Sequence, residues 1–330
     1  MFRLHQLTRS FCLFALLTVV LPMSAFADAK FPLNAKRILF LGDSITHAGG
    51  YVSWIETQLR LRGVDPMPEM INVGLSSETV SGLSEPDHPF PRPDVHERVD
   101  RALKKIKPDV VVACYGMNDG IYYPFGQERF QGYQDGVIRL IKKVHDAQAK
   151  LILVTPPPFD PVPLRGKGKL KPAGEERYAY FAMYEDYNDV MKRYGQWILK
   201  QKDRVEMVID VHMPTMDYLA EKRKQNPEFT LARDGIHPNA EGHRIIGEAI
   251  LKAWGISSTE PPAELLKLVS EKTRLLHDAW LSDVGHKRPG VKKGLPLAEA
   301  QTKVQALDAK IEALVKKSQS SDAPKNRSPK

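Results

Sequence analysis

Short apolar runs alternate along this chain with longer stretches of helical periodicity, and this alternation limits the folds that the chain can adopt. The apolar runs are rich in β-branched residues, as expected of strands that are buried on both faces. They are residues 37–41, 70–73, 110–114, 151–154 and 205–209. The stretches of helical periodicity lie at about 51–62, 94–106, 130–147, 177–201 and 239–254.

The repeated order of strand and helix predicts a parallel sheet that is covered by helices on both faces. Because the crossover connections between parallel strands are short and right-handed, we expect an α/β fold of the three-layer α/β/α sandwich type. Ligands of such folds bind beyond the carboxyl ends of the strands. The loops that follow the predicted strands are therefore the places to look for functional residues.

Size and charge exclude several classes of protein. A chain of 330 residues with 42% hydrophobic residues can bury a large core, which excludes general disorder, a fibrous repeat and a disulfide miniprotein. The net charge of +8 hints at an anionic partner. However, residues 28–256 hold 32 basic and 31 acidic side chains, so the excess lies at the two ends. The basic tail lacks interleaved aromatic residues, and nucleic-acid binding is not predicted.

The N-terminus carries an export signature. Two arginines precede an apolar run at 11–21, and small residues follow at 25–27. This pattern predicts a cleaved signal peptide over 1–27 and a secreted or periplasmic protein, the alternative being a short membrane anchor. No later segment reaches the roughly 20 apolar residues that a membrane span needs, so no stable membrane insertion is expected. Cys12 lies in the signal and leaves only Cys114, which excludes an intramolecular disulfide.

Four loops carry residues suited to acyl transfer. Ser44 follows the first predicted strand, Gly74 the second and Asn118 the third, while Asp234 and His237 follow the last. Acyl transfer requires a serine hydroxyl activated by an imidazole that a carboxylate orients. The spacing of Asp234 and His237 allows the carboxylate to face Nδ1 while Nε2 faces Ser44. The backbone N–H groups of Ser44 and Gly74 and the Asn118 amide are candidate donors to the oxyanion.

At these residues the chain resembles the SGNH, or GDSL-type, hydrolase superfamily over about residues 36–254. Four blocks match in the family order: Gly42-Asp43-Ser44-Ile45, Gly74, Gly116-x-Asn118-Asp119 and Asp234-x-x-His237. The resemblance implies a flavodoxin-like sandwich with a five-stranded parallel sheet in the order 2-1-3-4-5.

The same resemblance implies a serine esterase that needs neither metal nor cofactor. It makes Ser44 the nucleophile, His237 the base and Asp234 its orienting group, with Ser44, Gly74 and Asn118 as the oxyanion hole. The Gly-x-Ser-x-Gly motif of the α/β-hydrolases is absent, and so are His-Glu-x-x-His and paired-cysteine metal motifs.

Each of these residues also has a purely structural interpretation. Ser44 can cap the following helix, and Gly74 can be glycine because the backbone turns there. Asn118 can close its own loop, and Asp234 and His237 can form a polar turn.

Neighbouring polar and aromatic residues are assigned structural roles. Asp43 and Asp119 are interpreted as acceptors that stabilise their loops. His47 is interpreted as a surface histidine, although contact with substrate is the alternative. Tyr51 and Trp54 suit core packing better than sugar stacking.

The C-terminal part is predicted to be a helical appendage to the hydrolase domain at 28–256. It comprises a helical extension at 257–317 and a disordered tail at 318–330. We expect the helices to form a hairpin docked on the sandwich, the alternative being a dimerising coil, and the oligomeric state is left open. A compact basic turn at 285–290 is a candidate for contact with an acidic substrate. The loops at 86–93 and 156–176 lie near the active end and are candidates for shaping the pocket.

Together these features predict a secreted serine esterase that removes acyl groups through an acyl-Ser44 intermediate. The predicted reaction is removal of acetyl groups from carbohydrate, and the predicted partner is a small-molecule or polysaccharide ester. The preference for acetyl rests on the export signal, the lack of a long apolar lid and the habits of secreted members of the family. One alternative is a lipid or aryl-ester acylhydrolase. The other is a non-catalytic envelope protein that binds glycan.

Overall fold

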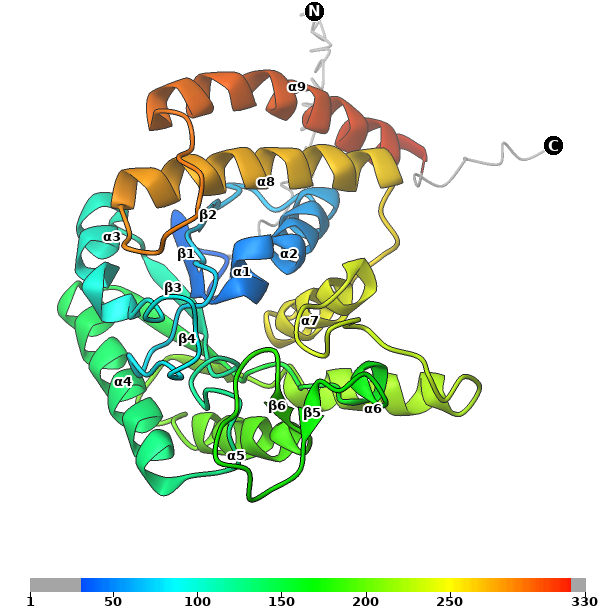
Figure 1. Cartoon of the computed structure of the whole chain (residues 1–330). Helices are drawn as coiled ribbons and strands as arrows, with labels where there is room; N and C mark the ends of the chain where they lie inside the picture. Colours follow the sequence, from blue (N-terminus) through cyan, green and yellow to red (C-terminus); the bar gives the residue numbers. More distant parts are fainter. Residues whose placement is uncertain (1–30, 322–330) are drawn as a thin grey trace, which may run out of the picture.

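The structure is a computed structural model that describes residues 31–321. The signal peptide predicted at 1–27 lies outside the described residues. So does the part of the predicted tail at 322–330. Figure 1 shows the whole chain, with a central sheet surrounded by helices and a pair of long helices along one side.

A five-stranded parallel sheet forms the centre of the molecule. Its strands are β1 (Arg37–Gly42), β2 (Glu69–Asn72), β3 (Val110–Cys114), β4 (Lys150–Val154) and β7 (Met207–Ile209). They pair in the order β2-β1-β3-β4-β7. Because β7 is the fifth strand predicted from the sequence, the fold and the order 2-1-3-4-5 are confirmed. Every residue of β3 is buried, as its apolar composition requires.

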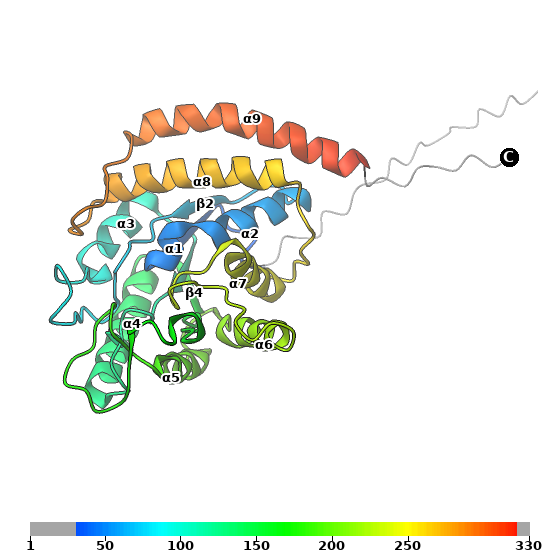
Figure 2. The same ribbon diagram turned by 45° about the vertical axis from the view of Figure 1, so that its right-hand side comes forward.

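Helices cover both faces of this sheet. They are α1 (Ser44–Ala48), α2 (Gly50–Leu61), α3 (Val99–Ile106), α4 (Gln127–Asp146), α5 (Tyr187–Leu199), α6 (His212–Arg223) and α7 (Ala240–Ala253). Helices α2 and α7 pack together on one side, and α3 and α4 pack together on the other (Figures 1 and 2). This is the three-layer arrangement that right-handed crossovers produce.

Two further helices, α8 (Ala263–Val284) and α9 (Leu297–Ser321), form the C-terminal extension. They run side by side, and α8 packs on α2 and β2 (Figure 2). A small apolar cluster joins Leu265 and Val269 of α8 to Ile311 of α9. The chain therefore folds the extension back on its own sandwich as a helical hairpin.

Three segments differ from the sequence-based expectation. Helix α5 starts at Tyr187 rather than near 177, because the chain before it forms a two-stranded sheet of β5 (Leu170–Lys171) and β6 (Met183–Tyr184). Helix α6 was not expected; its Pro214 lies in the first turn, where a missing N–H costs nothing. Helix α9 continues to Ser321, so 318–321 are helical rather than part of the predicted tail.

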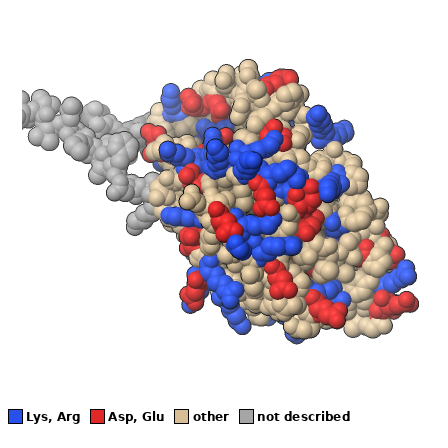
Figure 3. Space-filling view, turned by 90° about the vertical axis from the view of Figure 1, so that its left-hand side faces the viewer, with Lys and Arg blue, Asp and Glu red and all other residues tan. Residues whose placement is uncertain are grey.

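Basic and acidic side chains are mixed on the face that carries α3 and α4 (Figure 3). Ion pairs such as Lys143–Asp100 and Arg101–Glu97 account for some of this mixture. Among residues 31–321, no helix is both long enough and apolar enough to span a membrane.

Candidate active site

Ser44 follows the carboxyl end of strand β1, which lies between β2 and β3 in the sheet, and is the first residue of α1. Asp43 caps this helix, because its Oδ1 accepts a hydrogen bond of 2.9 Å from the N–H of Ile45. Gly42 allows the tight turn: a Cβ there would lie 2.1 Å from Oγ1 of Thr46 and 2.8 Å from the carbonyl oxygen of Cys114. Sheet, turn and cap together place the Ser44 hydroxyl at the rim of the sheet.

Folding brings Ser44, His237 and Asp234 into one hydrogen-bonded chain. Nε2 of His237 lies 2.8 Å from Oγ of Ser44, and Nδ1 lies 2.6 Å from Oδ2 of Asp234. The other carboxylate oxygen of Asp234 accepts the backbone N–H groups of Ile236, at 3.0 Å, and of His237, at 2.8 Å. The turn from 234 to 237 therefore holds the carboxylate and the imidazole in a fixed relation before any ligand binds.

The electrostatics suit proton transfer from serine to imidazole. Burial alone would raise the pKa of Asp234, but the hydrogen bonds from His237 outweigh it and hold that pKa well below its usual range. An ionised Asp234 can only accept, so Nδ1 of His237 carries a proton and Nε2 is free to accept from Oγ of Ser44. The hydrogen bond to Asp234 raises the pKa of His237, against an opposing effect of burial.

Asn118 lies beside Ser44, in the loop after β3. Its Oδ1 accepts a hydrogen bond of 3.0 Å from the hydroxyl of Tyr122, and its Nδ2 donates one of 3.1 Å to the carbonyl oxygen of Glu78. Because an amide nitrogen has two hydrogens, the second remains available to a ligand. Asn118 can therefore stabilise the loops of the site and still donate a hydrogen bond to a ligand, so its two interpretations are compatible.

Gly74 does not lie where the oxyanion-hole hypothesis needs it. Its backbone N–H donates to Oδ1 of Asn72 at 2.8 Å, and it does not line the cavity that contains Ser44. A Cβ at this position would lie 2.4 Å from the backbone nitrogen of His47 and 2.6 Å from the carbonyl carbon of Thr46. Gly74 is glycine because the loop after β2 packs directly on α1, and this corrects the role expected from the sequence.

Ser77, three residues further on, occupies the position that Gly74 was expected to fill. It lines the same cavity as Ser44 and Asn118. Its φ of 68° is in the left-handed region, which non-glycine residues rarely adopt. Within residues 31–321 its N–H has no acceptor. The sequence does not point to Ser77 as a donor, because a serine gives no indication that its backbone adopts a positive φ.

The other residues considered from the sequence have structural contacts. Oδ1 of Asp119 accepts the N–H groups of Val80 and Ser81, at 2.9 and 2.8 Å. Burial raises the pKa of Asp43 to about 7 and that of Asp119 to about 6. His47 is half-buried against Gly74, 3.2 Å from its carbonyl oxygen, and lines a different cavity from Ser44.

The three catalytic candidates open into a cavity of about 480 Å³, a size typical of small-ligand sites. Its wall combines polar groups with aromatic rings, which come from several segments far apart in the chain. The lining residues include Ser76, Ser77, His88, Phe90, Arg92, Asn118, Tyr122, Lys169, Tyr180, Phe181, Ile236 and Arg288. Within the described part of the chain, no group of three or more His, Cys, Asp or Glu side chains is arranged to hold a metal ion.

Comparison with known proteins agrees with this geometry. Residues 40–245 match the sequence profile described as the GDSL-like Lipase/Acylhydrolase family. No curated protein sequence matches the chain significantly.

Two solved structures are similar in fold. A gut microbial diltiazem-metabolizing enzyme is 22% identical with a TM-score of 0.51; the alignment covers 67% of this chain and 47% of that one, so the chain spans about half its length. A variant of Axe2, an acetyl xylan esterase from Geobacillus stearothermophilus, is 22% identical with a TM-score of 0.50 and is covered over 68% and 97% of the two chains.

Proposed function

Because the chain belongs to the GDSL-like lipase/acylhydrolase family and is a serine ester hydrolase, we propose that it removes acetyl groups from carbohydrate outside the cytoplasm, through an acyl-Ser44 intermediate. The observation that carries this proposal is the continuous hydrogen-bonded chain from Ser44 through His237 to Asp234. The export pattern at the N-terminus supports the proposed location.

The geometry supports the following sequence of steps. Oγ of Ser44 attacks the ester carbonyl carbon while Nε2 of His237 takes the hydroxyl proton. The leaving alcohol receives that proton from His237, and the acyl group stays on Ser44. Water then attacks the acyl-serine while His237 takes one of its protons. His237 returns that proton to Oγ of Ser44 as the acyl–oxygen bond breaks, which releases the carboxylic acid and restores the enzyme. Asp234 stays ionised throughout and keeps the imidazole oriented.

We propose three donors for the oxyanion, all from residues that line the cavity. They are the backbone N–H groups of Ser44 and Ser77 and the free hydrogen of the Asn118 amide. Each such donor is typically worth about 3–4 kcal/mol of the barrier, because it is in place before charge develops. We therefore assign Ser77 the role that the sequence suggested for Gly74.

The wall of the cavity supports a carbohydrate substrate. Tyr180 and Phe181 are unusually exposed for aromatic residues, at 42% and 50%, and both line the cavity. Exposed aromatic faces beside polar groups suit a sugar ring, which presents C–H groups on its faces and hydroxyls at its edge. The similarity in fold to an acetyl xylan esterase is compatible with this class of substrate.

One observation favours a second candidate, an esterase for longer acyl or aryl groups. A mostly apolar cavity of about 460 Å³ adjoins the first and shares Phe90 and Arg92 with it. Its other apolar lining residues are Leu75, Pro91, Pro93 and Pro289. Comparison of p-nitrophenyl esters of increasing chain length separates the two candidates: the acetyl ester should be the best substrate, and a maximum at long chains would favour the second.

The decisive test of the esterase is Ser44→Ala. We expect this variant to lose p-nitrophenyl acetate hydrolysis by about 10⁴-fold or more, since no other group can form the acyl intermediate. Its melting temperature should stay nearly unchanged, because the deletion removes one hydroxyl at the cavity rim. Ser270→Ala, a serine of α8 that does not line this cavity, is the matched control. Turnover retained in Ser44→Ala would remove Ser44 from the mechanism.

A further inference from the structure

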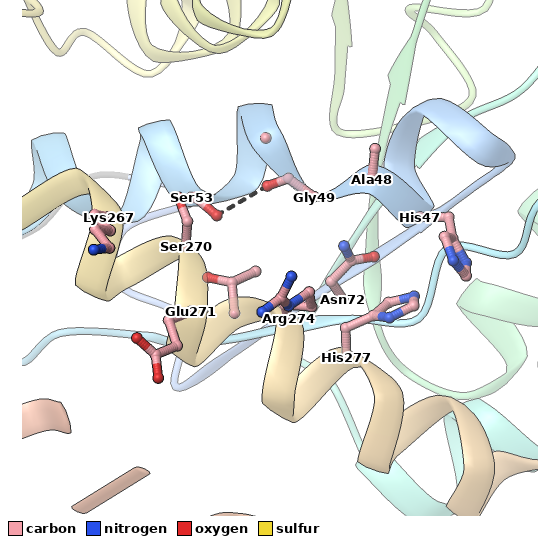
Figure 4. A pocket seen from close by; sticks show the side chains of 12 residues that line it. His47, Ala48, Gly49, Ser53, Asn72, Lys267, Ser270, Glu271, Arg274 and His277 are labelled. Carbon is pink, nitrogen blue, oxygen red and sulfur yellow. Dashed lines mark hydrogen bonds between the residues drawn. The ribbon is translucent and has the colours of Figure 1, made fainter. Parts of the chain in front are cut away.

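The C-terminal extension lies beyond the part matched by the family profile. Its helix α8 contacts α1, the helix that begins at Ser44, and the loop after β2. His277 of α8 is buried, and its Nε2 lies 2.9 Å from the carbonyl oxygen of Gly74. Its ring meets that of His47 from α1 edge to face, at 4.5 Å between centroids. Figure 4 shows these two histidines facing one another, with Asn72 close by, at one end of a cavity of about 400 Å³ between α8 and the first helices.

The segment after α8 then reaches the active-site cavity itself. It turns at Gly285, where φ is 78°, and brings Arg288 to the loop after β2. Nε of Arg288 donates to the carbonyl oxygen of Ser76 at 3.0 Å, and the guanidinium lies 5.1 Å from the centre of the Phe90 ring. These two contacts hold the guanidinium in one place before a ligand binds.

Arg288 lines the same cavity as Ser44 and His237, and so does Lys169, which comes from the segment just before β5. Neither cation has a carboxylate partner within the described part of the chain. Of the other charged groups in the wall, Arg92 is neutralised by an ion pair, whereas Asp234 keeps its negative charge and orients His237. Arg92 makes hydrogen bonds of 2.5 and 2.6 Å to the buried Glu85, and Asp234 is bonded to His237.

Among the described residues, the cavity therefore presents two cations without an ion-pair partner next to exposed aromatic rings. The planar guanidinium of arginine matches a carboxylate with two parallel hydrogen bonds, and Nη2 of Arg288 has no partner among residues 31–321. A sugar that carries a carboxylate on its ring offers the negative charge and the stacking face together.

We propose that the preferred substrate is an acylated carbohydrate that carries a ring carboxylate, and that Arg288 of the C-terminal extension, with Lys169, forms the subsite for this carboxylate. The proposal rests on the esterase activity proposed above and adds the substrate class. It also gives the extension a function: α8 positions a specificity-determining residue that the family-matched part of the chain does not contain.

The test uses two substrates that differ in the charge of the ring carboxyl group: acetylated oligogalacturonate, and its primary amide, which is uncharged and adds no second ester. For the full-length enzyme at low ionic strength, we expect kcat/KM for acetate release to be at least about 10-fold higher with the free carboxylate, mainly through KM. This ratio should fall as salt is added, because salt screens charges near the surface.

Arg288→Gln should lower the ratio about 10-fold, and Lys169→Gln should lower it by a smaller factor because the lysine is more exposed. Arg288→Lys should restore part of the preference, since it keeps the charge but not the paired donors. Lys292→Gln is the matched control: it removes the same charge from an exposed side chain of the same segment that lines neither cavity. It should leave the ratio unchanged.

Two results would overturn the subsite. One is a wild-type enzyme that does not distinguish the two substrates. The other is an equal loss on both substrates in Arg288→Gln, which would mean that Arg288 only supports the loop at Ser76. If either result appears while p-nitrophenyl acetate is still hydrolysed in a Ser44-dependent way, the esterase stands and the subsite alone fails.

Discussion

At the scale of single residues, this site shows which roles a local pattern specifies. Ser44, Asp234 and His237 could be selected from the sequence because each is a side chain whose chemistry is needed, at a place where a parallel sheet gathers loops. The backbone donor could not be selected in this way, because every non-proline residue has a backbone N–H. The sequence therefore did not distinguish Gly74 from Ser77. Which N–H is free depends on where the loop turns, and the positive φ of Ser77 has no counterpart in its residue type.

The raised pKa of His237 predicts the pH dependence of the reaction. Only the neutral imidazole can accept the serine proton, so kcat/KM should fall as the pH drops through a pKa above the ordinary value of 6.5. Steady-state hydrolysis of p-nitrophenyl acetate between pH 5 and 9 measures this. A profile that stays flat from pH 5 to 8 would contradict the assignment of His237 as base.

Asp234→Asn provides the control for this explanation. It removes the carboxylate whose hydrogen bond raises the pKa of His237, so that pKa should decrease. Nuclear magnetic resonance titration of the imidazole detects the change without depending on residual activity. An unchanged His237 pKa in this variant would mean that another group is responsible.

At the scale of elements, one buried ion pair holds the loop that carries Ser77. Arg98, the residue before α3, donates two hydrogen bonds of 2.6 Å to the carboxylate of Glu78, and both side chains are almost fully buried. The hydroxyl of Tyr115 donates to the same carboxylate at 2.7 Å. The backbone of Glu78 in turn accepts from Asn118, so this cluster links two loops of the site.

Breaking this pair should destabilise the fold strongly. Glu78→Gln leaves the Arg98 guanidinium as an uncompensated buried charge, and we expect the free energy of unfolding to fall by about 3–5 kcal/mol. Urea denaturation measures the loss. Asp146→Asn is the control, because the Lys142–Asp146 pair is 74% and 62% exposed and such pairs contribute about 0–1 kcal/mol. Similar small losses in both variants would show that the buried pair does not support the loop.

At the scale of the whole molecule, the C-terminal hairpin is part of the folded body. Helix α8 lies against α2 and β2, and α9 covers α8 from outside. The seam between the two helices is short and apolar, with Leu265, Val269 and Ile311 fully buried. Most of the stability of α9 should come from this seam, because a helix of its composition is marginal alone.

Ile311→Ala tests that packing. Truncation of a fully buried isoleucine typically costs about 2–5 kcal/mol, and the loss should appear as lower stability to urea. Glu312→Ala, at the next and exposed position, should change stability by less than about 0.5 kcal/mol. If Ile311→Ala unfolds like the unmodified chain, α9 does not pack on α8 in solution.

The strand and helix pattern was enough to predict the sandwich, the strand order came from the resemblance to the family, and both agree with the structure. The reason is that fully buried strands must be apolar throughout and that parallel strands allow few connections. The two-stranded sheet of β5 and β6, by contrast, is too short for periodicity to reveal it. Helix α6 was not predicted because it is only weakly amphipathic and Pro214 lies near its start.

Residue types and their order along the chain were also enough to propose a nucleophile, a base and an orienting carboxylate, because the chemistry of a side chain is a property of residue type. They could not identify the free backbone donor at Ser77 or bring Arg288 to a cavity more than 200 residues away from Ser44. Both depend on distances between segments that only folding brings together: the packing of Gly74 on α1, and the docking of α8 behind it. Residue chemistry is local, whereas the availability of a group to a substrate is a property of its three-dimensional surroundings.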